Sequence, residues 1–210
     1  MRLAHLMALA DSRLPTGGHV HSGGVEEAVT SGLVRDVDTM EAFLRRRIRT
    51  SGLVAGSVAA AVCSGELTPA HGDLEMDART PSPASRAASR AQGRGLLRLA
   101  KAVWPEQDWS TLDSRPHLPV ISGSVGRATG VDAREAALVV VYTTMTGSAI
   151  AAQRLLALDP AQVAASTFAL SDLCEDIADR CVKGLAGVSD PLMDVVAQRH
   201  ADRDRPLFAS

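Results

Sequence analysis

Several residue types are scarce in this chain, and each scarcity excludes a class of protein. The 210 residues include three cysteines, an odd number with no CxxC pair, which argues against a disulfide framework and a structural zinc site. Aromatic residues make up only 3%, so the core must be built from Ala, Val and Leu, as in closely packed helices. The net charge of −2 offers no basic excess for nucleic acid. We therefore expect a reduced, cytoplasmic protein.

Long hydrophobic runs are also rare. The first fifteen residues are mildly apolar, but they contain His5 and Asp11 and do not have the form of a signal peptide. Residues 136–153 form a run of 18 uncharged residues, which just reaches the length of a membrane span. Hydroxyl groups and a glycine at 143–148 favour a central bundle helix instead, so no membrane association is expected.

Apolar residues recur at helical spacing along most of the chain. A basic helix is expected through residues 86–98, and another helix begins at Asp38 or Thr39. The other predicted helices cover residues 3–11, 22–31, 51–65, 70–78, 120–128, 133–158, 163–183 and 192–203. Together they predict one all-α domain over residues 1–210, a bundle of roughly eight to ten helices.

A glycine-rich loop that feeds a helix carries the most distinctive local pattern, LPTGGHVHSGGVEEAV at residues 14–29. Pro15 stops whatever precedes it, and Gly17 permits backbone angles that are closed to other residues. Ser22 is the predicted N-cap, and Glu26 falls near the first turn, where a carboxylate suits the positive helix end. Such a loop is a common place for function.

Histidines give only weak support for a metal site. His19 and His21 lie two residues apart and can project to the same side of an extended loop. No nearby Cys or third His completes the three or four ligands that a site needs, so polar loop residues are the competing interpretation. His71, His117 and His200 are scattered, with no obvious partner. With no GxSxG or HExxH motif either, no catalytic residue is assigned.

A row of arginines marks the middle of the chain. The arginines of this row stand four residues apart. Like charges at that spacing along one helix repel each other by about a few tenths of a kcal/mol per pair. The row therefore fits either an anionic partner or a solvated surface. A nucleic-acid binder is one hypothesis, and the net charge of −2 counts against it. The row consists of Arg86, Arg90, Arg94 and Arg98.

The C-terminal segment RPLFAS is too short to fold alone. Leu207 and Phe208 would be exposed unless they dock. We expect these two residues to pack on the protein itself or on a partner.

Several segments, in order, resemble the urease accessory protein UreF family. In the loop, the family pattern of Pro-x-Gly followed by Ser-x-Gly, a hydrophobic residue and Glu is matched by Pro15, Gly17, Ser22, Gly24, Val25 and Glu26. His19 and His21 depart from it, because the family carries aromatic or hydroxyl residues there. The stretch ARTPSPASRAASRAQGRGLLRLA is similar to the family's middle helix, and HLPV with Gly123 to its His-x-Pro-Val-x-x-Gly segment.

The resemblance continues to the end of the chain. AIAAQRLLAL is similar to the helix with the family's characteristic arginine, here Arg154, and the tail from His200 onward resembles the family's C-terminal motif. Ala201 stands where the family often has Glu, and Pro206 also departs from the motif.

The resemblance implies a non-catalytic urease maturation factor that dimerises. Such a protein binds the D-type (or H-type) accessory protein, recruits the G-type GTPase and assists nickel insertion into apo-urease. It holds no cofactor stably; nickel is in transit, along a route that His19 and His21 would line, and GTP belongs to the partner. The implied partner-binding residues are Pro15, Gly17, Ser22, Gly24, Glu26, Arg86, Arg90, Arg94, Arg98, Arg154, His200, Leu207 and Phe208. The alternative is a helical metal-dependent enzyme that uses the His19/His21 loop.

Overall fold

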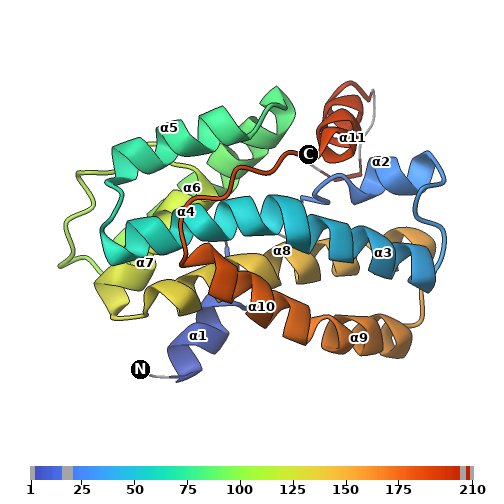
Figure 1. The fold of residues 1–210 in the computed structure, drawn as a ribbon, viewed down its shortest axis with the longest axis horizontal. Helices are drawn as coiled ribbons and strands as arrows, with labels where there is room; N and C mark the ends of the chain where they lie inside the picture. Colours follow the sequence, from blue (N-terminus) through green and yellow to red (C-terminus); the bar gives the residue numbers. More distant parts are fainter. Residues whose placement is uncertain (1–2, 16–20, 204–206, 209–210) are drawn as a thin grey trace.

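Helices build almost all of the protein, as the computed structural model shows for residues 3–15, 21–203 and 207–208 (Figure 1). Because α3, η2 and α4 run on as one continuous helix, these residues form ten separate helices, which confirms the predicted all-α, single-domain bundle. The elements are α1 (Leu3–Leu9), α2 (Val25–Thr30), α3 (Val37–Arg47), the π-helical turn η2 (Ile48–Gly52), α4 (Leu53–Ser64), α5 (Pro69–Arg79), α6 (Pro83–Val103), α7 (Leu118–Thr129), α8 (Ala133–Leu156), α9 (Pro160–Ala169), α10 (Ser171–Cys181) and α11 (Pro191–Ala201).

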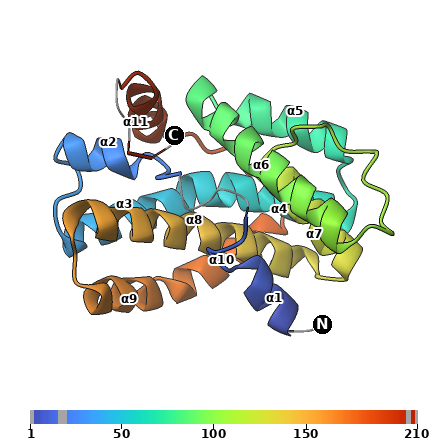
Figure 2. The same cartoon turned by 180° about the vertical axis from the view of Figure 1, so that it is seen from behind.

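Helix α4 forms the centre of the bundle and contacts α5, α7, α8 and α10. Seen from both sides, α5 and α6 lie along one flank of α4 and α10 along the other, while α9 continues beside α3 (Figures 1 and 2). Ten of its twelve residues are buried, which confirms the uncharged, surrounded helix predicted for residues 51–65. Gly56 is required here, because a Cβ on it would lie 2.7 Å from the Sγ atom of Cys181 on α10.

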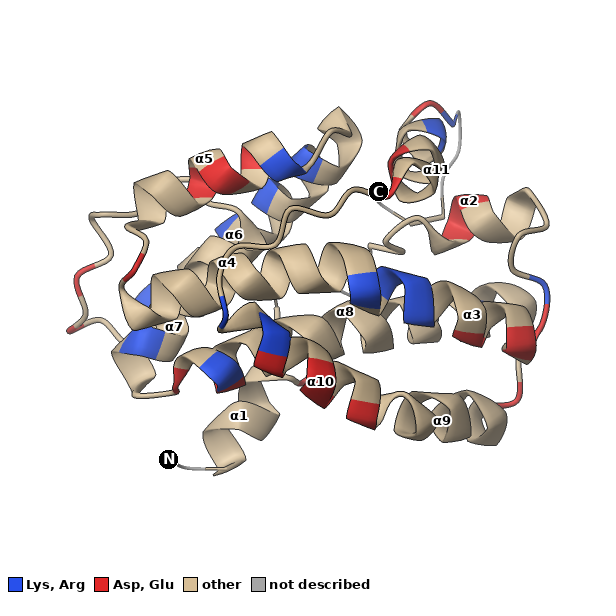
Figure 3. Cartoon of the chain, viewed as in Figure 1, with Lys and Arg blue, Asp and Glu red and all other residues tan. Residues whose placement is uncertain are grey.

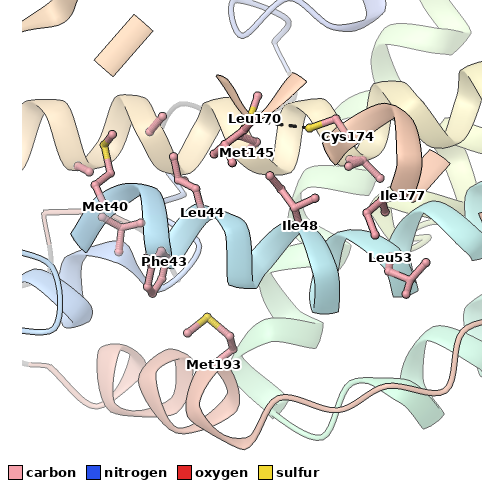
Figure 4. Packing of buried hydrophobic residues seen from close by; sticks show 14 of the residues in the cluster. Met40, Phe43, Leu44, Ile48, Leu53, Met145, Leu170, Cys174, Ile177 and Met193 are labelled. Carbon is pink, nitrogen blue, oxygen red and sulfur yellow. Dashed lines mark hydrogen bonds between the residues drawn. The ribbon is translucent and has the colours of Figure 1, made fainter. Parts of the chain in front are cut away.

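The largest hydrophobic cluster joins the α3–η2–α4 helix to α8 and α10 (Figure 4). Met40, Leu44 and Ile48 are fully buried, and they pack with residues of α8 and α10 such as Met145 and Ile177. These large side chains fill a core that is otherwise rich in Ala and Val, as the scarcity of aromatic residues predicts.

The three cysteines are free and buried. Burial raises the pKa of the Cys63 and Cys174 thiols to about 11 and that of Cys181 to about 12. The Sγ atom of Cys174 lies 3.8 Å from the Sδ atom of Met145 (Figure 4). Buried thiols with raised pKa values are unreactive, so the cysteines serve as small core residues.

The short helix predicted near residues 70–78 is confirmed as α5, Pro69–Arg79. Two other predicted element boundaries are wrong. Asp36 caps α3, two residues before the predicted Asp38, because its carboxylate accepts from the backbone N of Thr39 in a capping box. The helix predicted over 163–183 is two helices that meet at Leu170, a residue whose apolar character continues the helical pattern across the break.

Helix α8 follows its sequence signals closely. Asp132 caps it in a capping box with Glu135, and the run Val139–Val141 is helical. By length and composition alone, α8 passes the test for a membrane-crossing helix. This is weak support for a span, because half of its apolar window is buried in the protein, as in the core helix of a soluble bundle.

Candidate functional site

Helix α11 and the C-terminal segment lie against α2, so residues near the start and near the end of the sequence are side by side there (Figures 1 and 2). The carboxylate of Glu26 on α2 receives three hydrogen bonds. His200 Nε2 lies 2.7 Å from Oε2, and the backbone N–H groups of Leu207 and Phe208 donate to Oε1 and Oε2 at 2.9 Å each. Four candidates from opposite ends of the sequence are thus brought together. We refer to Glu26, His200, Leu207 and Phe208 as the tail latch.

The centre of the tail latch is shielded from water. The Glu26 side chain is 5% exposed and that of His200 is 1% exposed. Burial opposes ionisation of Glu26, but hydrogen bonds from Leu207, His200 and Phe208 outweigh it and keep the pKa of Glu26 below its ordinary value. The buried carboxylate is therefore charged at neutral pH, and its bonds within the chain hold the tail.

The backbone conformation just before α2 places Glu26 next to α11. Helix α2 begins at Val25 with Gly24 as its N-cap, so the prediction of Ser22 as the cap is wrong. Gly24 has φ +88°, a left-handed conformation that favours glycine, and a Cβ there would lie 3.0 Å from Val196 of α11. Ser22 is buried, and its hydroxyl accepts from the backbone N of Glu26 at 3.4 Å. The glycine lets α11 approach α2, which brings His200 to Glu26.

The two apolar tail residues have different surroundings. Phe208 is half-buried and packs on the main hydrophobic cluster. This matches the expectation that the residue packs on the protein itself. Leu207 is 79% exposed, although its backbone N is bound to Glu26. Arg203 adds a second tie, because its Nη1 lies 3.0 Å from Glu27 Oε2. The latch therefore fixes the tail backbone and leaves the Leu207 side chain on the surface.

The rest of the glycine-rich loop is only partly described. Pro15 is exposed, whereas Gly17 and His19 lie outside the described residues. His21 lines a cavity of about 580 Å³. In the described part of the chain, no group of three or more His, Cys, Asp or Glu residues is placed to hold a metal ion. The arrangement therefore adds no support for the metal-dependent enzyme.

The arginine row divides into two halves along α6. Arg90 Nη2 lies 2.7 Å from Asp77 of α5, and Arg86 donates to the backbone oxygen of Thr80 at 2.6 Å. Arg94 and Arg98 are exposed. Figure 3 shows the basic residues of α6 beside the acidic residues of α5. Arg86 and Arg90 thus join α6 to α5 and to the loop that follows α5. Arg94 and Arg98 are the members of the row whose charges are exposed.

His117 joins this charged cluster from the start of α7. Its Nε2 lies 2.9 Å from Asp77 Oδ1, and its backbone N donates to Asp73 Oδ1 at 2.7 Å. Burial lowers the pKa of His117, against the opposing effect of Asp77. The expectation that His117 and His200 lack partners is therefore wrong, because each meets a carboxylate distant in sequence.

The remaining candidate, Arg154, is exposed near the end of α8, on a different helix from the tail latch.

The acidic face of α10 pairs with Arg134 of α8, whose guanidinium lies 2.7 Å from Glu175 and 2.5 Å from Asp179. These acids therefore form an exposed ion-pair network.

Sequence reasoning missed two residues beside the cavity. Asp190, whose side chain is 4% exposed, accepts from Arg46 Nε at 2.7 Å and Nη2 at 2.6 Å. Arg47 donates through Nη1 to the backbone oxygen of Gly23 in the glycine-rich loop. The only sequence signals were the position of Asp190 before Pro191 and an arginine run at residues 45–47, and neither specifies which side chains meet.

Comparison with known proteins matches this architecture to one family. The UreF family profile matches residues 34–171, more than half of the chain. A urease accessory protein UreF from Mycolicibacterium vanbaalenii is 68% identical over 211 residues, which cover 99% of both chains. Those of Mycobacterium marinum and Mycobacterium tuberculosis are 63% and 61% identical over 208 residues, again 99% of both chains. The chain belongs to the UreF family of urease accessory proteins.

Proposed function

We propose that this protein is a non-catalytic urease maturation factor. It binds the D-type (H-type) accessory protein, recruits the G-type GTPase and assists nickel insertion into apo-urease. The observation that carries the proposal is the identity of 61–68% over 99% of the chain to proteins named urease accessory protein UreF. Within the proposal the protein is cytoplasmic and dimeric, and it holds no cofactor of its own.

The tail latch supports a specific docking surface. Glu26 binds the backbone of residues 207 and 208, so the tail is presented in a defined conformation. The Leu207 side chain is 79% exposed on that tail, as an apolar anchor for a partner would be. We place the docking of an accessory partner at Leu207, and assign Arg94, Arg98 and Arg154 as exposed charges that steer acidic partner surfaces.

A binding assay with purified components tests the docking surface. The chain is mixed with the D-type and G-type accessory proteins, and the products are analysed by size-exclusion chromatography with light scattering. We expect a defined complex that is weakened by Leu207→Ala and lost when residues 205–210 are deleted. Leu74→Ala is the matched control, because Leu74 is a comparably exposed leucine on α5, at 65% exposure.

The outcomes separate the docking surface from the function itself. If Leu207→Ala and the deletion both bind with unchanged affinity, the tail is not the docking surface, while a complex would still support the maturation factor. No complex, together with one tightly bound metal ion per chain, would overturn the maturation factor in favour of the metal-dependent enzyme.

Nickel transit is tested apart from complex formation. His21 is the described member of the loop pair that the proposal assigns to the nickel route. We expect His21→Ala to slow the activation of apo-urease by nickel and to leave the accessory complex intact. Activation at the wild-type rate would remove His21 from the route.

A further inference from the structure

The guanidinium of Arg47 has donor groups that no described residue binds. Its neighbour Arg46 binds Asp190 side-on, through Nε at 2.7 Å and Nη2 at 2.6 Å. Arg47 uses only Nη1, which donates to the backbone oxygen of Gly23. Among the described residues, no acceptor meets its Nε or Nη2, and the Nε atom is enclosed by protein. A buried polar group without a partner is unusual and calls for an explanation.

The surroundings make this guanidinium costly to leave unpaired. Burial lowers the pKa of Arg47 to about 10, although the negative charge of Asp190 acts in the opposite direction. The other described arginines that are not exposed all pair with carboxylates: Arg45 with Glu41, Arg79 with Glu75, Arg86 and Arg90 with Asp77, Arg134 with Glu175 and Asp179, and Arg203 with Glu27. A charge in this position is stabilised best by an anion that binds the remaining donor group, Nη2.

The same arginine lines the cavity of about 580 Å³, a volume within the range of small-molecule sites. Around Arg47 the wall offers the hydroxyl groups of Thr50 and Ser51. Apolar side chains contributed by α4, α8 and α11 include Val54, Val140 and Met193. Three carboxylates lie on the wall. Asp190 binds Arg46 and Asp11 binds Arg13, while Asp194 accepts from the backbone N of Ser82 at 3.4 Å and has its pKa raised by burial. The cavity thus combines one unneutralised cation with a largely apolar body.

We propose that this cavity binds a small organic acid, one carboxylate on an apolar body, with the carboxylate on Nη2 of Arg47. A guanidinium N–H donates a charge-assisted hydrogen bond to a carboxylate, as Nη2 of Arg46 does to Asp190 at 2.6 Å one residue away. A single guanidinium balances one negative charge, so a monoanion fits better than a dianion such as phosphate. Gly23 assists, because a Cβ there would lie 2.7 Å from Nη2 of Arg47.

Octanoate is the probe, with octan-1-ol as a neutral ligand of the same length and acetate as an anion without the apolar body. Binding to the full chain is measured by isothermal titration calorimetry and by the rise in melting temperature. We expect octanoate to bind more tightly than octan-1-ol or acetate, and Arg47→Met to raise its Kd about tenfold or more, because a charge-assisted contact is lost. Arg49→Met is the matched control, since Arg49 is exposed on the π-helical turn that follows Arg47.

If Arg47→Met does not fold, a second variant tests whether octanoate binds in the cavity. Gly147 of α8 lines the cavity, and a Cβ on it would meet no atom within 4 Å, so the side chain of Gly147→Leu begins in open space. We expect this variant to fold and to bind octanoate more weakly. Equal affinity for octanoate and octan-1-ol, equal affinity for octanoate and acetate, or unchanged binding by Arg47→Met or Gly147→Leu would overturn the proposal. The assay contains no urease protein, so its result is independent of the maturation function.

Discussion

Replacing Glu26 with Gln tests whether one buried carboxylate holds the C-terminal tail. Glutamine keeps a single acceptor oxygen and puts an NH₂ group at the other position. Wherever the oxygen is placed, the NH₂ group faces at least one of the donors now bound: His200 Nε2, the Leu207 N–H or the Phe208 N–H. The substitution therefore leaves a donor unsatisfied in a protected site and removes the charge that strengthens the remaining bonds.

The magnitude follows from the count of affected bonds. An unsatisfied buried donor costs about 1–3 kcal/mol, and the loss of charge assistance on the other bonds adds about 1 kcal/mol. The Glu26 side chain is only 5% exposed, so solvent screens little of this effect. We expect the free energy of unfolding to fall by about 2–4 kcal/mol, equivalent to roughly 5–12 °C in melting temperature for a chain of this size.

Urea unfolding followed by circular dichroism gives the free energy, and hydrogen exchange read by mass spectrometry gives the protection of the tail amides. Glu27→Gln is the control on the same helix, because Glu27 binds Arg203 and not the tail backbone. We expect this control to lose about 1 kcal/mol or less and to keep the tail amides protected. If Glu26→Gln stays within about 0.5 kcal/mol of the wild type, and its tail amides exchange as slowly, the carboxylate does not hold the tail.

Three other predictions concern stability. The lowered pKa of Glu26 stabilises the fold at pH values above its ordinary 4.5, and this contribution is lost as the pH falls through the folded pKa. The protection factors of the tail amides between pH 3 and pH 7, corrected for the intrinsic pH dependence of exchange, should therefore fall at the acid end in the wild type and be low throughout in Glu26→Gln. Gly93→Ala should destabilise by about 3 kcal/mol or more in urea unfolding, because its Cβ would overlap a backbone carbonyl, whereas Gly147→Ala meets open space and should stabilise by up to about 1 kcal/mol. Asp190→Asn should lower the unfolding free energy by about 1–3 kcal/mol, since it weakens the bidentate bond from Arg46; no change in the urea midpoint would contradict this.

Sequence patterns predicted the fold well where the signal is local. The cap of α8 at Asp132 depends on Glu135, three residues away, and the buried stripe Met40, Leu44 and Ile48 depends on helical spacing alone. The break at Leu170 was missed because nothing local announces it. The residue is apolar and fully buried, with helical dihedrals, and no Gly or Pro stands beside it. The change of direction there depends on how α9 and α10 pack.

The sequence predicted a role for each part of the tail latch separately, but not the contact between the parts. Glu26 was read as an acid that suits the start of a helix, and His200, Leu207 and Phe208 as a tail in need of a surface. Both descriptions are correct as far as local chemistry reaches. The bonds that join them link residues 174 to 182 positions apart, and no helical spacing or cap rule relates such positions. The exposure of Leu207 likewise depends on where Glu26 fixes the tail backbone.

The contacts of Arg46 and Arg47 also could not be predicted from local sequence patterns, and they lead to one more prediction. Successive residues on a helix point about 100° apart, so Arg46 meets Asp190 while Arg47 turns to Gly23 and the cavity. Asp190 already acts on Arg47 through space, raising its pKa against burial. In an Arg46→Met variant the Asp190 carboxylate loses its arginine partner, and Arg47, on which its charge already acts, is able to neutralise it. We therefore expect Arg46→Met to weaken octanoate binding although it removes no cavity residue, because Asp190 would then compete for Nη2 of Arg47. An unchanged Kd for octanoate would show that Nη2 of Arg47 is not available to Asp190.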